Sequence, residues 1–366
     1  MVVHASLGDR GPIVAEVRAR LVRLGYLPND GGGVEFDQSA DRAVRAFQQE
    51  RRISVDGVVG PTTFRHLEEA RWRLGDRVLW YSAAHPHVGD DVEDLQRRLS
   101  DLGFSLGRVD GIFGSSTDAA LREFQRNVGM TADGTCGWNT VVALQRLDRT
   151  VKGGTPERLW DEHAHAANRT GITDKMIVLD PGHGGVDPGV EGHGLSEAVI
   201  AEDLARRIEG RLAAIGTQVL LTRPPTRFLD REVTEAERAA MANDVAADLV
   251  ISLHADGGPS QRLHGAATYY YGSARNASEL GRSFAAIVQS EIIRRTDLVD
   301  CHSHPKTWDM LRLTSMPTVR VEVGYLTHAG DAARLSQPRF RDTLAEAIAA
   351  AAVSFFSPID EPDAEQ

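Results

Sequence analysis

Cysteine is nearly missing from this chain of 366 residues, which contains only Cys136 and Cys301. Two cysteines so far apart in sequence indicate no disulfide framework, so we expect both to be buried small apolar residues. Long apolar runs are also lacking, and no segment approaches the length of a membrane span. The N-terminus, MVVHASLGDRGPIVAEV, has no basic segment followed by an apolar stretch and a cleavage site. The sequence therefore predicts a cytoplasmic protein without a secretion signal.

Dense runs of lysine or arginine are lacking as well, and the formal net charge is −11 at pH 7. Such an acidic chain is a poor partner for nucleic acid. The content of 42% hydrophobic and 25% charged residues is typical of a folded soluble protein and argues against general disorder. A chain of this length exceeds one ordinary core, so we expect two or three domains.

The first 150 residues contain a duplicated segment. VRARLVRLGYL, from Val17, parallels LQRRLSDLGFS, from Leu95, and AVRAFQQERRISVDGVVG, from Ala43, parallels ALREFQRNVGMTADGTCG, from Ala120. A repeat this long with matched glycines indicates two copies of one small domain. Apolar residues at helical spacing that stop at glycine predict about three short helices in each copy.

Each copy resembles the type-1 peptidoglycan-binding domain, which has a Leu-Gly turn, an Asp-Gly-x-x-Gly turn and an Ala-x-x-x-Phe-Gln helix. The second copy, with VDGIFGSST before its helix, matches this pattern better than the first, which has NDGGGVEFDQSA there. The resemblance implies that peptidoglycan or a muropeptide is a partner. A scaffolding or protein-docking role is the alternative that the spacing leaves open. We expect the two repeats at residues 1–72 and 79–147.

Strand and helix signals alternate from about residue 175, after a polar stretch at 148–174 that predicts a linker. We expect His163 and His165 of this linker to be solvated. The alternation predicts an α/β domain at 175–358, with a mostly parallel sheet flanked by helices and preceded by the two small all-α three-helix domains. An acidic tail, 359–366, follows. Strands are predicted at 176–180, 218–223, 248–255, 265–272 and 318–326, and helices at 196–216, 234–246, 277–293 and 340–356.

Polar residues fall near the ends of the predicted strands, where open sheets of this class bind their ligands. His183 lies in the glycine-rich loop of MIVLDPGHGGVDPG, His254 ends VISLHAD, and Glu197 lies in the first turn of a predicted helix. A hydrogen-bonded histidine, or a glutamate favoured by the helix dipole, is the structural alternative for each. Jointly, two histidines and one glutamate form the ligand set of a catalytic zinc site with a fourth position open to water.

Glu322 is the fourth candidate, because a carboxylate inside the apolar strand VRVEVGYL needs a partner or a shifted pKa. The segment from about 175 to 356 resembles the Amidase_3 family of zinc-dependent N-acetylmuramoyl-L-alanine amidases. The resemblance runs through DPGHGG, the helix-opening glutamate, SLHAD and MPTVRVEVGYLTH. It implies one Zn²⁺ per chain held by His183, Glu197 and His254, with Glu322 as the catalytic glutamate. The implied reaction is hydrolysis of the amide between N-acetylmuramic acid and the L-alanine of the stem peptide.

The sequence departs from that family in several places. Ala198 and Ala201 stand where the family has lysine and asparagine, and DCHSHPKTWDM replaces a segment centred on an Arg-Gly pair. We do not expect the nearby histidines to ligate zinc; these are His193, His302 and His304.

The order of domains resembles the actinobacterial CwlM-type proteins. This implies an alternative function: a non-catalytic cytoplasmic regulator of peptidoglycan precursor synthesis that binds muropeptide or pathway enzymes through the amidase fold. A metallohydrolase acting on another amide is the second alternative, because fold and zinc alone do not determine the substrate.

Overall fold

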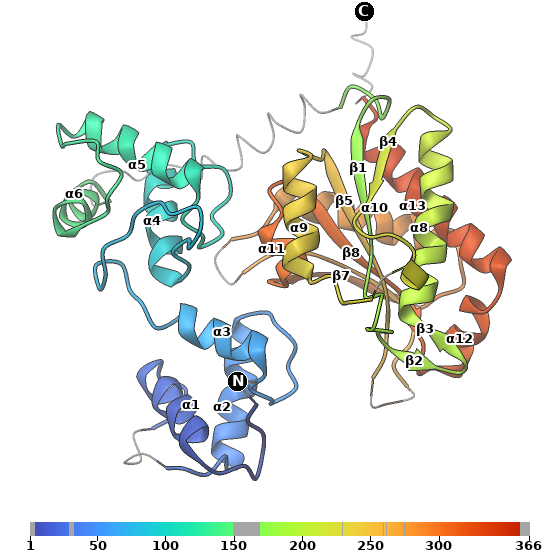
Figure 1. Ribbon diagram of the computed structural model, residues 1–366, viewed down its shortest axis with the longest axis horizontal. Helices are drawn as coiled ribbons and strands as arrows, with labels where there is room; N and C mark the ends of the chain where they lie inside the picture. Colours follow the sequence, from blue (N-terminus) through green and yellow to red (C-terminus); the bar gives the residue numbers. More distant parts are fainter. Residues whose placement is uncertain are drawn as a thin grey trace, which may run out of the picture. The chain divides into compact units, whose positions relative to one another are not determined.

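The computed structural model describes residues 4–28, 33–148, 169–228, 230–258, 260, 262–273 and 276–358. The chain divides into two compact units, Met1–Trp160 and Asp161–Gln366 (Figure 1). His163, His165, the expected tail and most of the expected linker lie outside the described residues. Among the helices of the described ranges, none is both long and apolar enough to cross a membrane.

The first unit consists of two groups of helices (Figure 1). Each group has its own apolar core. Phe47 is fully buried in one core and Phe124 at the matching place in the other. Three helices contribute to each group, which confirms the predicted pair of small helical domains. The helices are α1 (Pro12–Arg23), α2 (Gln38–Glu50), α3 (Pro61–Glu69), α4 (Asp90–Asp101), α5 (Ser115–Asn127) and α6 (Trp138–Asp148).

A buried glutamine closes the Asp-Gly turn of each copy. Gln48 accepts a hydrogen bond from the Gly57 N–H at 2.9 Å, and Gln125 accepts one from the Gly134 N–H at 2.9 Å. Each side-chain amide also donates to the aspartate that precedes the glycine. The recurring Gln and Asp-Gly pairs of the sequence therefore meet in space, and their burial is balanced by hydrogen bonds.

The second unit is built on a sheet whose strands, in the described residues, lie in the order β4-β1-β5-β8-β6-β7. Neighbouring strands from β4 to β8 run parallel, whereas β6 is antiparallel to β8, and β7 runs parallel to β6. The expected mostly parallel sheet is thus confirmed. Its strands are β1 (Met176–Pro181), β4 (Gln218–Leu221), β5 (Leu249–Asp256), β6 (Ala266–Tyr271), β7 (Asp300–Lys306) and β8 (Thr318–Tyr325), and β2 (Glu191–Gly192) pairs separately with β3 (Leu195–Ser196).

Helices cover both faces of this sheet, as Figure 1 shows, with α9 on one side and α8 and α13 on the other. Ile251 and Leu253 of β5 face the larger core, whereas Val250 belongs to the core that includes Met310 of α11. Because side chains alternate along a strand, His254 lies on the same face as Val250. The elements are α8 (Glu197–Ala213), η1 (Thr226–Phe228), α9 (Glu235–Asp244), α10 (Glu279–Arg295), α11 (Asp309–Leu313), α12 (Ala329–Leu335) and α13 (Pro338–Phe356).

Two features differ from what the sequence indicates. The segment DCHSHPK forms β7, an outer strand whose exposed polar residues carry no apolar alternation. Cys136 is buried as expected, but the expectation is wrong for Cys301, which is only half-buried on β7 and donates to the His264 carbonyl at 3.2 Å. An outer strand has one unpaired edge, so its side chains are not all covered.

Candidate metal centre

The three predicted metal ligands come together at one point of the second unit. His183 follows β1, Glu197 is the first residue of α8, and His254 lies near the end of β5. One ligand atom from each lies within 4.8 Å of the other two. Glu197 Oε1 is 2.7 Å from His254 Nδ1 and 3.2 Å from His183 Nε2. The structure therefore groups side chains that are 14 and 57 residues apart in sequence around a single carboxylate oxygen.

The glycine-rich loop makes this approach possible. A Cβ on Gly182 would overlap the His254 ring, and one on Gly189 would lie 2.6 Å from Glu197 Oε2. His183 itself has a φ of 57°, a backbone conformation that costs energy for a side-chain-bearing residue. The backbone of the loop is thus strained at His183, and this conformation brings the His183 imidazole against Glu197 and His254. Such local strain is expected at a site in which a ligand is held.

Neighbouring groups fix the orientation of the cluster. Glu197 accepts hydrogen bonds from the Val190 N–H at 2.9 Å and the Ala255 N–H at 3.2 Å. His183 Nδ1 is 2.6 Å from Asp187 Oδ2, which leaves Nε2 facing Glu197. A carboxylate behind a histidine is the usual second support of a metal-binding imidazole. Asp187 was not predicted from the sequence, although the His-x-x-x-Asp spacing within the loop is visible there.

The charges of the cluster suit a cation. Burial disfavours ionisation of Glu197, but the bonds from His183 and His254 outweigh it and hold the pKa of Glu197 well below its usual range. Burial, followed by the charge of Arg320, lowers the pKa of His254 to about 3. Burial also acts on His183, but Glu197 and Asp187 outweigh it and raise the pKa of His183. At neutral pH the site thus holds an anionic carboxylate beside a neutral His254, the protonation states that metal ligands require.

His254 provides an independent sign of an unmet partner. Within the described residues, its Nε2 is buried and has no hydrogen-bond partner. A buried polar atom without a partner costs about 1–3 kcal/mol, so native structures rarely retain one without a functional reason. The residues present therefore fit a divalent metal such as zinc, for which two imidazoles and a carboxylate are a standard ligand set.

Glu322 lies next to this cluster on the neighbouring strand. It is the register partner of His254 in the parallel pair of β5 and β8, so both side chains project from the same face of the sheet. Arg320 Nε donates to Glu322 Oε1 at 2.7 Å, whereas Oε2 is buried and, in the described part of the chain, has no hydrogen-bond partner. Burial raises the pKa of Glu322 to about 7, against the opposing charge of Arg320. Arg320 was not among the residues that the sequence analysis singled out.

The other histidines near these motifs lie outside the cluster of ligand atoms. His193 lies between β2 and β3, and His302 and His304 are exposed on β7. Ala198 and Ala201 are fully buried in α8.

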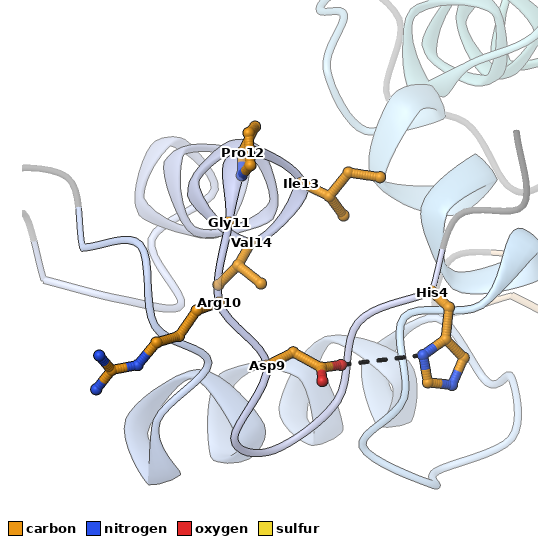
Figure 2. Close-up of a pocket in the computed structure, with 7 residues that line it drawn as sticks. All are labelled: His4, Asp9, Arg10, Gly11, Pro12, Ile13 and Val14. Carbon is orange, nitrogen blue, oxygen red and sulfur yellow. Dashed lines mark ion pairs between the residues drawn. The ribbon is translucent and has the colours of Figure 1, made fainter.

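A separate pocket of about 400 Å³ lies at the start of α1 in the first unit. Figure 2 shows its lining, which includes an ion pair between His4 Nδ1 and Asp9 Oδ2 at 3.9 Å. Both side chains are largely exposed, so the pair contributes little to stability. None of the predicted site residues lines this pocket.

Comparison with known proteins finds relatives of both parts of the chain. Residues 177–354 match the family described as N-acetylmuramoyl-L-alanine amidase. Residues 10–67 and 88–144 match the family described as "Putative peptidoglycan binding domain". The chain is 45% identical, over 94% of its length, to the N-acetylmuramoyl-L-alanine amidase CwlM of Mycobacterium tuberculosis and covers 87% of that protein. The chain therefore belongs to the N-acetylmuramoyl-L-alanine amidase family.

Other relatives match a smaller share of the chain. The amidase LytC of Bacillus subtilis is 30% identical over 50% of this chain, which covers 36% of LytC. Among solved structures, the amidase AmiC2 of Nostoc punctiforme is 30% identical, with a TM-score of 0.45 and coverage of 50% of this chain and 96% of that one. The amidase Ami1 of Mycobacterium smegmatis is 25% identical, with a TM-score of 0.46 and coverage of 51% and 99%.

Proposed function

We propose that the protein is a zinc-dependent N-acetylmuramoyl-L-alanine amidase, which hydrolyses the amide between the lactyl group of N-acetylmuramic acid and L-alanine of the stem peptide. The observation that carries this proposal is the convergence of His183, Glu197 and His254, with Glu322 beside His254 on the next strand. Membership of the amidase family supports the choice of substrate.

In the proposed site, His183, Glu197 and His254 hold one zinc ion per chain. When bound, such an ion supplies Lewis acidity toward a carbonyl oxygen and acidifies water. Asp187 keeps the proton of His183 on Nδ1, so that Nε2 is the ligand atom. The N–H groups of Val190 and Ala255 hold Glu197 in place.

Glu322 is the proposed general base and acid. Its free oxygen, Oε2, takes a proton from the attacking water and then delivers it to the amine of the leaving L-alanine. A pKa of about 7 is suited to this exchange near neutral pH, because the group releases and accepts a proton with similar ease. The same exchange on Oε1 is opposed by the bond from Arg320.

We assign the helical repeats, 1–72 and 79–147, to retention on peptidoglycan, and 175–358 to catalysis. The family matches of both regions support this division. Repeats that hold the polymer raise the local concentration of cleavable bonds at a tethered catalytic domain.

The proposal is tested by measuring zinc content together with digestion of isolated wall material. We expect wild-type protein to bind about one zinc per chain and to release stem peptides with a free L-alanine amine. Glu322→Gln should keep the zinc and lower kcat by about 10²–10⁴-fold, the usual contribution of a general base. Normal cleavage by Glu322→Gln would show that another group is the base.

The non-catalytic alternative is a cytoplasmic regulator that binds muropeptide or enzymes of precursor synthesis. It predicts that zinc-bound wild-type protein binds muropeptide without cleaving it. Mass spectrometry of muropeptide after long incubation separates the two functions, because only the amidase splits the substrate into sugar and peptide. A third outcome, cleavage of another amide but not of muropeptide, would support the unrelated metallohydrolase.

A further inference from the structure

Arg320 is an unusual residue for its position in the sheet. It lies in the apolar strand β8, and its side chain is only 18% exposed. A cation that is enclosed to this extent is costly unless its neighbours compensate its charge. We propose that Arg320 is the positioning residue of Glu322 and fixes which carboxylate oxygen exchanges the proton. This inference rests on the proposed function, since that reaction requires a base in a defined orientation.

The guanidinium of Arg320 is held on several sides. Its Nε donates to Glu322 Oε1 at 2.7 Å, and its Nη1 donates to Glu235 Oε1 at 3.3 Å. Glu235 is anchored in turn, because its Oε2 accepts the Met310 N–H at 3.1 Å. The Arg320 Cζ also lies 4.5 Å from the centre of the Trp308 ring, within the range of a cation–π contact. An arginine restrained in this way is a rigid support for the carboxylate that it binds.

The geometry of the strand explains why Arg320 reaches Glu322 and not another residue. Positions two apart on a strand project from the same face, so Arg320 and Glu322 lie side by side above the sheet. The charge-assisted bond occupies Oε1, and Oε2 is left without a partner among the described residues. His254 is the register partner of Glu322. The candidate metal ligands therefore lie beside the strand position that carries the unpaired Glu322 oxygen. Arg320 thereby selects one of two otherwise equivalent oxygens.

A purely structural role is the competing explanation. In that case Arg320 serves only to pair with Glu235 and to pack against Trp308, and Glu322 keeps its orientation without it. If Arg320 positions Glu322, removing Arg320 moves the Glu322 carboxylate and lowers kcat. If Arg320 is only structural, the carboxylate keeps its orientation and kcat does not change. Arginine and lysine also differ here, because a lysine ammonium cannot bind two carboxylates through a planar fork.

The test uses the full chain with Arg320→Met, Arg320→Lys and Arg207→Met. Arg207 is a control because it also bridges two carboxylates, Asp203 and Asp342, but contacts no site residue in these ion pairs. Crystal structures of the metal-free variants report the Glu322 conformation, and muropeptide hydrolysis by the zinc-bound proteins reports kcat and KM. If Arg320→Met does not fold, Glu235→Gln is used in its place in both measurements, because this variant removes the outer anchor of Arg320.

We expect Glu322 to leave its wild-type rotamer in Arg320→Met and kcat to fall by up to about 10²-fold at a nearly constant KM, as for a displaced catalytic group. Arg320→Lys should recover part of the loss, and Arg207→Met should match wild type. An unchanged Glu322 conformation, or a changed one with unchanged kcat, overturns the inference. If zinc-bound wild type has no turnover, the proposed amidase function fails, and the crystal structures alone decide whether Arg320 holds Glu322.

Discussion

Buried polar side chains are used in two different ways in this molecule. In the second helical repeat, the amide nitrogen of Gln96 donates to Asp110, Ile112 and Thr117, and its oxygen accepts the N–H groups of Asp110 and Gly111. In the amidase domain, by contrast, His254 and Glu322 are equally buried, yet each has one atom without a partner among the described residues.

The difference separates a buried polar group that the fold satisfies from two that are open to a proposed ligand. A satisfied side chain such as Gln96 recovers its desolvation cost from the protein itself, so it stabilises the folded chain without any other molecule. An atom such as His254 Nε2 does not recover this cost internally. The candidate metal centre is therefore expected to lower the stability of the metal-free protein, and a ligand bound there would restore it. Substitutions in the two regions should affect different measurements.

Removing a predicted metal ligand should have the largest effect. Loss of a residue that only supports a metal ligand usually weakens metal binding by about 10- to 100-fold. We therefore expect His254→Ala, which removes a ligand itself, to weaken zinc binding by more than about 100-fold. The metal content of the purified protein and a competition titration with a chelator measure this directly.

The matched control for this variant is His302→Ala, because His302 is an exposed histidine of the same unit that lies outside the cluster. It should bind zinc as wild type does. If His254→Ala retained full zinc affinity, the proposed ligand set would be wrong. The partnerless atom of His254 would then have to be explained without a metal.

Removing the support behind a ligand should have a smaller effect on the same measurement. Asp187→Ala deletes the carboxylate that lies 2.6 Å from His183 Nδ1. We expect a 10- to 100-fold loss of zinc affinity, since the imidazole keeps its place but loses its fixed orientation. Asp187→Asn should lose less than Asp187→Ala because an amide oxygen still accepts the Nδ1 proton. Equal affinities of both variants and wild type would exclude a supporting role for Asp187.

A substitution in the helical repeats should lower the stability of the repeats and leave zinc affinity unchanged. Gln96→Ala leaves several buried groups without partners and should lower the free energy of unfolding by about 3 kcal/mol, near the upper end for an unsatisfied buried group. Hydrogen exchange in the full chain should be faster in α4 to α6, with zinc affinity unchanged. Glu123→Ala, an exposed position on α5, is the control and should have little effect. Faster exchange confined to the amidase domain would contradict this division of roles.

Much of this arrangement was predictable from sequence because it depends on local patterns. The strand MIVLD, the glycine loop and the helix that begins at Glu197 each have a clear signal, and their order predicts a parallel sheet. Since carboxyl ends of parallel strands meet at one edge, His183 and His254 were expected close together. The repeated segments likewise predicted two copies of one small domain, and Gln48 and Gln125 make equivalent hydrogen bonds in the two copies.

The remainder depends on contacts that no local pattern encodes. Gln96 aligns with Arg18 in the duplicated segment, so the comparison of repeats hides its role. In the structure Arg18 instead donates to the Glu35 carbonyl at 3.1 Å. Arg320 looks like a solvent-facing residue of an alternating strand, and only the packing of Trp308 and Glu235 shows that it is enclosed. Strand β7 lacks apolar alternation because it lies at the edge of the sheet.

The smallest effect that we expect concerns the pH dependence of stability without metal. Because burial and Arg320 lower the pKa of His254 to about 3, from 6.5 in the unfolded chain, the folded protein binds fewer protons here than the unfolded one. The corresponding stability is present above pH 6.5 and is lost as the pH falls toward 3. Between pH 8 and pH 5 this loss amounts to roughly 2 kcal/mol, at about 1.4 kcal/mol per pKa unit.

His183 acts in the opposite direction, since its pKa is raised in the folded protein and its contribution is lost as the pH rises. The difference between wild type and His254→Ala isolates the His254 contribution, because His183 is present in both. Urea unfolding with a chelator at pH 8 and pH 5 measures this difference in the free energy of unfolding. Between pH 8 and pH 5, wild type should lose more stability than His254→Ala. A difference that is equal at both pH values would mean that His254 can be protonated in place, and that its burial is not the source of the open, metal-ready state.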